Sequence, residues 1–273
     1  MSTRKNPVFM VFLLLLAPPL AMSAASPAPA ALPDGLAATL PKLAGNAPIA
    51  GTLVVNQSSI DGEGAKAKHS QASITLDVSA VRGIDLHVPG SVLEEANRQI
   101  AAHQLDPERS MPAAEMLGSV GIVQTQRMLD PAAALRVVLI GARLLQQAPT
   151  TLDGAPATLL RFDLPLQASK SDRDKIKSYH DELSLWLDAQ GVPIGFARTT
   201  KTDLGWFVLN VDTDRSEQGR FQVVDGRLIT TQLDVQQHTS ALGHHGTTTT
   251  RYTLHVTAPA QGVRQIRVPR RAA

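Results

Sequence analysis

Residues 181–202, DELSLWLDAQGVPIGFARTTKT, predict a β-hairpin around which the rest of the fold can be arranged. The three leucines of LSLWL alternate with a serine and Trp186, which is the period of a strand with one buried face. Gly191 then breaks the pattern and can adopt the positive φ of a short hairpin. Because Trp186 lies on the opposite face from the leucines, we expect both faces of this strand to be at least partly covered.

Other short segments show the same alternation and together predict an antiparallel meander. The Asp-Gly pairs at 153–154 and 225–226 are typical of tight hairpin turns. The predicted strands are 51–55, 73–78, 84–88, 144–152, 157–164, 206–212, 221–224, 228–236 and 247–257. The predicted connections include a hairpin loop at 58–68, a loop or surface helix at 167–179, DTDRSEQG at 212–219 and LGHHG at 242–246.

Residues 91–142 have helical instead of strand periodicity and form a helical block. Ser91 and Glu94 match a capping box, which predicts a helix ending near His103. Asp130-Pro131 places a capping side chain and a first-turn proline at the start of a later helix.

Between these two helices, residues 112–128 predict another helix, whose propensity Gly118 and Gly121 lower. A short helix is also expected at 35–43. The helices have to cover one face of the sheet, because their own apolar stripes would otherwise be exposed. The sequence therefore predicts an α+β fold.

The N-terminus has the order of a secretory signal peptide. Arg4 and Lys5 precede the apolar run 8–17, which small residues follow. Ten apolar residues are too few for a membrane-spanning helix, which needs about 20. We expect cleavage after Ala25 and a secreted, periplasmic protein that does not span the membrane. The expected organisation is a signal peptide (1–25), a flexible linker (26–34), one α+β domain (35–260) with the helical block 91–142, and a basic tail (261–273).

Charge and cysteine content narrow the class of protein. The formal net charge is +2, and removal of Arg4 and Lys5 with the signal peptide brings it to zero. Binding of nucleic acid requires clustered positive charge in the folded body, so no nucleic-acid partner is expected. The tail carries four arginines and is either a solvated end or an anchor for anionic lipid or envelope polymer. The absence of cysteine favours a bacterial envelope protein.

Two consecutive stretches, GARLLQQAPTTLDGAPATLLRFDLPL (141–166) and DELSLWLDAQGVPIGFART (181–199), resemble exported proteins with the LolA-like half-barrel fold. That family includes periplasmic lipoprotein carriers and the sensor domain of periplasmic sigma-factor regulators. The resemblance covers roughly 60 residues. It implies a curved antiparallel sheet with the helical block on its concave face, and a hollow that binds acyl chains. The longer helical block and the aromatic content of 4% depart from the family, and none of its functional residues can be placed here.

Metal-site patterns are weak. His238, His244, His245 and His255 could supply imidazole ligands, but their spacing matches no zinc framework, and His244 and His245 point to opposite faces of an extended strand. A second group has oxygen ligands at spacings similar to those of a calcium loop, but its glycine comes too late and the closing glutamate is missing. Its members are Asp212, Asp214, Ser216 and Glu217. Neither pattern predicts a metal site.

Catalytic patterns are equally weak. Ser119 in LGSVG lacks the preceding glycine of a nucleophile elbow. The carboxylate pairs Asp181-Glu182 and Asp172-Asp174 flank a charged loop, where no raised pKa is expected. We therefore predict neither catalytic residues nor a cofactor.

The leading hypothesis is a non-enzymatic binding module for an apolar or lipid-like ligand, with a lipid or a lipoprotein as partner. If the helical block lies in the concavity of the sheet, the predicted wall residues of the hollow are Leu117, Ile122, Val138 and Leu139. The alternative is a protein-interaction or envelope-stress sensor module that recognises an envelope protein through a strand edge or the polar outer face. A hydrolase is the third hypothesis.

Overall fold

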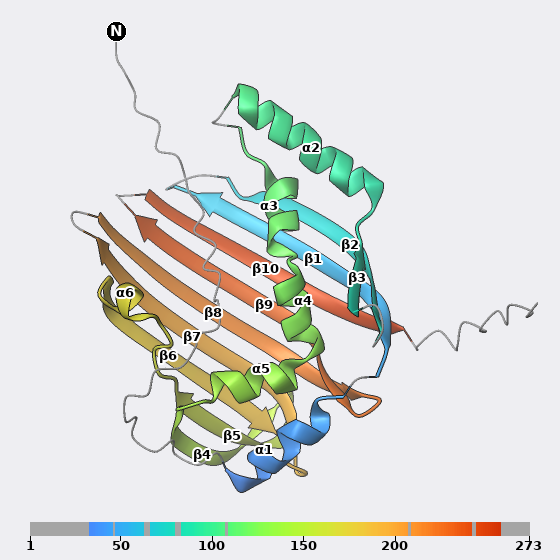
Figure 1. Cartoon of the computed structure of the whole chain (residues 1–273), viewed down its shortest axis with the longest axis vertical. Helices are drawn as coiled ribbons and strands as arrows, with labels where there is room; N and C mark the ends of the chain where they lie inside the picture. Colours follow the sequence, from blue (N-terminus) through green and yellow to red (C-terminus); the bar gives the residue numbers. More distant parts are fainter. Residues whose placement is uncertain are drawn as a thin grey trace, which may run out of the picture.

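The computed structural model describes residues 33–45, 47–62, 66–79, 83–106, 109–206, 209–241 and 244–257. The predicted signal peptide, the linker up to residue 32 and the basic tail lie outside these residues. The fold is α+β, with a ten-stranded sheet that is not closed into a barrel (Figure 1).

Every strand pairing in the sheet is antiparallel, in the order β3-β2-β1-β10-β9-β8-β7-β6-β5-β4. β1 pairs with β10, so the N-terminal strands join the end of the C-terminal meander. The strands are β1 (Ile49–Asp61), β2 (Lys68–Ser79), β3 (Gly83–His87), β4 (Arg143–Leu152), β5 (Ala155–Asp163), β6 (Ile176–Leu187), β7 (Pro193–Trp206), β8 (Leu209–Val224), β9 (Arg227–Ala241) and β10 (His244–Thr257).

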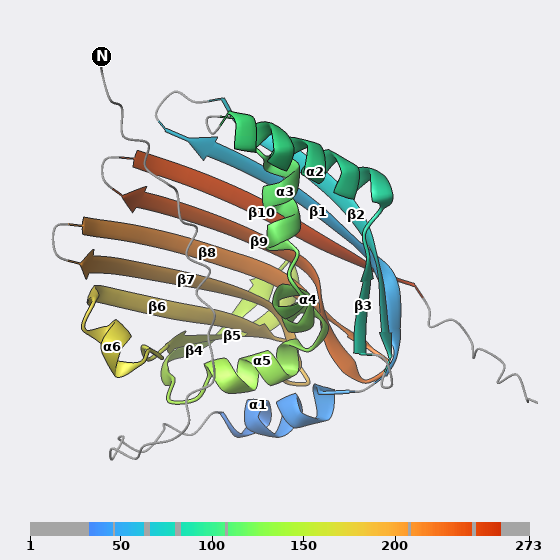
Figure 2. The same ribbon diagram turned by 45° about the horizontal axis from the view of Figure 1, so that its top comes forward.

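The sheet topology explains where the helices lie. β3 and β4 follow each other among the strands of the chain but form opposite edges of the sheet, so the segment between them has to cross it. α3 contacts β2 and β1, while α4 and α5 contact β9, all on one face (Figures 1 and 2). The helices are α1 (Asp34–Thr39), the 3-10 helix η1 (Leu40–Leu43), α2 (Gly90–Leu105), α3 (Pro112–Ser119), α4 (Ile122–Leu129), α5 (Pro131–Val138) and α6 (Lys170–Arg173).

The core consists of two apolar clusters between the helices and the sheet. One joins the buried side chains of β1, β2, β9 and β10 to Met116, Met128 and Leu129 of α3 and α4. The other joins β5 and β6 to α1, η1 and α5, and includes the leucines of the hairpin that was predicted first. Phe196 packs against both clusters, and it fits because Gly219 on the neighbouring strand has no side chain: a Cβ there would lie 2.4 Å from the phenyl ring.

The hairpins with strong turn signals are confirmed. β6 and β7 form the predicted pair, with Gly191 at a φ of 78° in the turn. Asp153-Gly154 and Asp225-Gly226 both have two consecutive residues of positive φ, as tight hairpin turns require. Trp186 is half-buried on the face opposite the leucines, so both faces of β6 are partly covered as expected.

Among the helices, the start at Asp130-Pro131 is confirmed: the Asp130 carboxylate accepts a hydrogen bond from the Ala133 amide at 3.2 Å. The capping box at Ser91 is wrong. α2 begins one residue earlier, and the Pro89 carbonyl accepts the first hydrogen bonds, from Val92 and Leu93. The single helix expected at 112–128 is broken into α3 and α4.

Four segments predicted as connections are partly or wholly strand. Residues 58–61 belong to β1, 176–179 to β6, 212–219 to β8 and 244–246 to β10. All four lie towards the same end of the sheet, where most residues on both faces are polar. An apolar alternation is absent there, which is why the sequence pattern did not indicate strands.

Both sheet edges are poor templates for pairing with another chain. β3 has only five residues, and β4 contains Pro149 and a register shift between Leu144 and Gln146. Proline and bulges protect edge strands from further pairing. In the described ranges, no helix is long and apolar enough to cross a membrane.

Candidate functional site

The face of the sheet that contacts the helices, here called the inner face, changes in character along the strands. Strand register and alternation place its side chains in rows that run across the sheet. The apolar half contains Leu185, Phe196, Leu233, Tyr252, Val55 and Ala72 in one row and Leu254, Leu53 and Ile74 in the next. The polar half contains Thr200, Arg215, Gln237, Thr248, Ser59 and Lys68 in one row and Thr202, Thr213 and Thr239 in the next.

The helices pack on the apolar half. Met116, Met128 and Leu129 are buried against it. Among the described elements, α3, α4 and α5 do not extend over the ends of β7, β8 and β9 that carry the polar half, at the left of Figure 2. The inner face is therefore amphipathic, with its apolar part buried beneath helices and its polar part half-buried.

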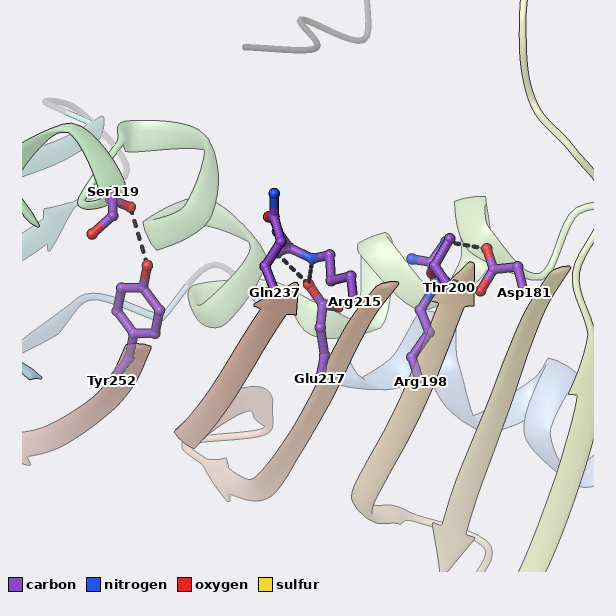
Figure 3. A network of polar contacts seen from close by, with 8 residues as sticks. All are labelled: Ser119, Asp181, Arg198, Thr200, Arg215, Glu217, Gln237 and Tyr252. Carbon is purple, nitrogen blue, oxygen red and sulfur yellow. Dashed lines mark hydrogen bonds and ion pairs between the residues drawn. The ribbon is translucent and has the colours of Figure 1, made fainter. Parts of the chain in front are cut away.

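A buried ion pair lies at the boundary between the two halves (Figure 3). Asp181 is 1% exposed and accepts two hydrogen bonds from Arg198, at 2.9 Å from Nε and 2.6 Å from Nη2. The Tyr179 hydroxyl donates to the same carboxylate at 2.7 Å and Thr200 at 3.2 Å. The carboxylate has four donors and is not free to act as a general base or as a metal ligand.

The pair sets the charge state of its members. Burial alone would raise the pKa of Asp181, but the hydrogen bonds from Arg198, Tyr179 and Thr200 hold that pKa below its usual range. Burial raises the pKa of Tyr179, and its hydrogen bond to the carboxylate raises it further. The hydrogen bonds to Asp181 raise the pKa of Arg198. Asp181 and Arg198 therefore stay ionised, and Tyr179 stays neutral, at neutral pH.

A second ion pair continues the network across the sheet (Figure 3). Glu217 lies opposite Arg198 on the neighbouring strand and accepts a hydrogen bond from Arg215 Nε at 2.8 Å. Arg215 also donates to the Gln237 amide oxygen at 3.3 Å. Positive and negative groups thus alternate over β6, β7 and β8 and cancel, so the network provides hydrogen-bonding groups without net charge.

Two buried polar atoms close to the boundary have no hydrogen-bond partner among the described residues: Gln57 Oε1 and Ser70 Oγ. The two residues are direct neighbours on β1 and β2, and Gln57 is 8% exposed. A buried acceptor without a donor is costly by about 1–3 kcal/mol. Both atoms are themselves buried, so a hydroxyl or amide group from outside the chain reaches them only if the side chains around them move.

The sheet holds the helices through two long side chains. The Tyr252 hydroxyl donates to the Ser119 carbonyl at the end of α3, at 3.2 Å (Figure 3). The Arg227 guanidinium donates to the Leu129 carbonyl at the end of α4, at 2.8 Å, and to the Ala47 carbonyl at 3.1 Å. Burial lowers the pKa of Arg227. A Cβ added at Gly118 or Gly121 would meet no heavy atom within 4 Å, so close packing does not require these glycines.

The four predicted wall residues do not come together. Leu117 packs against the cluster of β1, β2, β9 and β10, whereas Val138 and Leu139 belong to the cluster around α5. Ile122, the first residue of α4, is 63% exposed. The sequence did not indicate the polar network, although Asp181 and Arg198 stand in the hairpin that was predicted first and become diagonal neighbours once its register is known.

The metal and catalytic candidates gain no support. In the described part of the chain, no three His, Asp or Glu side chains are grouped so that they could hold a metal ion. His238 and His245 stack at 6.2 Å on the outer face, beside a shallow hollow formed with Ile60, Gly62 and Thr247. Asp214 pairs with Lys201 instead of facing the other acids of its group. The Ser119 hydroxyl donates to the Met116 carbonyl.

No family model matches the chain, and neither the curated proteins nor the solved structures include a match to it. The function therefore has to be inferred from the inner face itself.

Proposed function

We propose that this protein is an exported, periplasmic carrier of a lipid-like amphiphile, bound on the inner face of the sheet. The observation that supports the proposal is the division of that face into an apolar half that the helices cover and a half-buried polar half that they do not reach (Figure 2). An acyl chain beneath α3 and α4 would replace water at the apolar rows, at about 0.8 kcal/mol per CH₂ buried. The head group would then lie on the polar rows.

The polar rows favour an uncharged or zwitterionic head group. Arg198 and Arg215 are each paired with a carboxylate, so neither is available to neutralise a bare anion. Threonine hydroxyls, the Gln237 amide and the unpartnered atoms of Gln57 and Ser70 can donate to and accept from hydroxyl or amide groups. Glycerol, sugar or amide head groups have this chemistry.

In this proposal the sheet is a half-barrel, its inner face is concave, and the helices lie in the concavity as in the LolA-like proteins that the sequence resembles. The packing of α3, α4 and α5 on that single face supports the arrangement. The hollow beside His238 and the one beside Arg220 involve outer-face residues, so neither receives an acyl chain on the inner face, and the proposal requires a helix to move for the chain to enter. The break between α3 and α4 suits such an opening, which resembles local unfolding.

In this proposal the ligand is recognised on the inner face of the sheet and not at its edge strands. The short β3 and the proline and register shift in β4 argue against the interaction-module alternative where it relies on addition of a partner strand at a sheet edge.

Two measurements test the proposal. Native mass spectrometry of the protein purified from the envelope of the cells that produce it should show bound lipid. Titration with a fluorescent single-chain lipid below its critical micelle concentration should give saturable binding. Leu117→Asn should weaken that binding, because Leu117 packs on the apolar half, whereas the exposed control Leu105→Asn should not. Absence of both bound lipid and saturable binding would refute the proposal.

The movement of α3 that would admit the ligand can be tested with a matched pair of variants, because the chain has two tyrosines and one of them contacts α3. Tyr252→Phe removes the hydrogen bond to α3 and should raise the association rate by roughly two- to tenfold, the equivalent of one hydrogen bond. Tyr179→Phe removes a hydrogen bond from the polar network and should leave that rate unchanged. Equal effects of the two substitutions would show that α3 does not limit entry.

A further inference from the structure

The outward side of α4 and α5 exposes more apolar surface than folding requires. Four large apolar side chains in and directly after these helices are 57–65% exposed: Ile122, Val123, Val137 and Ile140. The same helices bury Met128, Leu129 and Leu135 in the two core clusters. Large apolar side chains left exposed on two consecutive helices, in addition to those that pack on the sheet, indicate an interaction site.

Two arginines lie among these apolar side chains. Arg127 and Arg136 are exposed, and neither forms an ion pair or hydrogen bond with a residue that the structure describes. The only acidic residue between 121 and 142 is Asp130, whose carboxylate is occupied with capping α5. The surface made by Ile122, Val123, Arg127, Arg136, Val137 and Ile140, the α4–α5 outer surface, is thus apolar with unpaired positive charge.

The other helix with exposed apolar side chains differs in charge. α2 exposes Leu93, Ile100 and Leu105, but it also carries Glu94 and Glu95, and Arg98 pairs with Glu95. That helix has no excess of unpaired positive charge, so of these two helical surfaces the α4–α5 outer surface is the one complementary to a negatively charged partner.

We propose that the α4–α5 outer surface docks on an anionic lipid bilayer. Short interfacial helices insert apolar side chains to the depth of the head groups while basic side chains remain near the phosphates. The unpaired arginines favour an anionic bilayer over a neutral partner. The apolar side chains can insert into a bilayer without a pocket of matching shape. The proposal does not depend on lipid binding at the inner face, although docking through the same helices would place that face near the source of its ligand.

Co-sedimentation of the exported protein with vesicles tests the docking. The protein should partition onto phosphatidylcholine vesicles that contain phosphatidylglycerol, more weakly onto phosphatidylcholine alone, and less at high salt. Arg127→Gln and Arg136→Gln should each lower partitioning to anionic vesicles by about fivefold. Ile122→Asn with Val137→Asn should lower it by more than about tenfold.

All four changes are at exposed side chains, so thermal unfolding should stay at the wild-type temperature. The control pair Leu93→Asn and Leu105→Asn on α2 should not affect partitioning. Replacement of Arg264, Arg267, Arg270 and Arg271 by glutamine tests the basic tail as the rival anchor and should leave most of the partitioning intact. Loss of partitioning in that tail variant, equal binding to both vesicle types, or no binding to either, as expected of a surface for a protein partner, would overturn the proposal.

Discussion

The two halves of the inner face are built from the same strands but differ in what holds them. In the apolar half, side chains such as Leu185 and Ile74 are buried by helices that cross the sheet. In the polar half, side chains such as Thr213 and Thr239 stand in rows that these helices do not reach (Figure 2), and backbone pairing and polar side-chain contacts hold the strands together. The stability of the fold should therefore reside in one half, while the other is free to vary in its contacts.

The largest expected effect is in the apolar half. Leu185 is 0% exposed and packs in the cluster of β5, β6 and α5, so Leu185→Ala should lower the free energy of unfolding by about 2–5 kcal/mol. Thr213→Ala in the polar half should change it by less than about 0.5 kcal/mol. Chemical denaturation measures both, and similar losses at the two sites would contradict the division.

The second-largest loss of stability is expected when the ion pair at the boundary is broken. Asp181→Asn leaves Arg198 without its bidentate partner and should cost about 2–3 kcal/mol near neutral pH, less than a fully buried pair because Arg198 is partly exposed. Because folding lowers the pKa of Asp181, this stabilisation is present above the unfolded pKa and is lost as pH falls through the lower folded value.

The difference between wild type and Asp181→Asn should therefore shrink when unfolding is measured at decreasing pH below about 4. Asp214→Asn removes an exposed ion pair with Lys201 and serves as the control, with an expected loss under about 1 kcal/mol. A pH-independent difference would show that the pair stabilises the fold by packing alone.

A substitution at Trp186 tests how much the outer face of β6, the strand with the buried leucines, contributes to stability. Its side chain is half-buried, so Trp186→Ala should cost about 2 kcal/mol, roughly half the value for a buried tryptophan. Denaturation that shows a loss below about 0.5 kcal/mol would mean that the outer face contributes nothing to either half.

The smallest predicted change is a gain. Gly118 lies within α3 and a Cβ there meets open space, so Gly118→Ala should raise stability by about 0.5–1 kcal/mol through helix propensity. Gly121 is the N-cap of α4, with an extended backbone, where alanine caps less well than glycine, so Gly121→Ala should lower stability. Thermal unfolding shows whether each substitution raises or lowers stability. If both change it in the same direction, the break between α3 and α4 does not lie where the structure places it.

The two halves also differ in how far the sequence predicts them. The hairpin at 181–202, the Asp-Gly turns and the start of α5 follow from local chemistry, because glycine, aspartate and proline restrict the backbone wherever they stand. Residues 212–219 were predicted as a turn because Thr213, Arg215 and Glu217 are polar on the inner face, although they form the middle of β8. Sequence periodicity detects a strand only if one of its faces is apolar.

The network at the boundary depends on register between strands, which the sequence does not state. Arg215 and Gln237 are opposite each other on β8 and β9, and the Tyr252–Ser119 contact joins a strand to a helix 133 residues earlier. Only the diagonal proximity of Asp181 and Arg198 could have been derived, from the predicted hairpin and the position of its turn.

The central claim, that one amphiphile lies across both halves, is tested most directly by photolabelling with two analogues of a single-chain lipid. One carries a diazirine next to the head group and the other carries it at the terminal methyl. The head-group reagent should label peptides containing Thr213, Gln237 and Thr248, and the chain-end reagent should label Met116, Met128 or Leu129 and the strands beneath them. Labelling of the same residues by both reagents, or labelling confined to the outer face, would contradict the account.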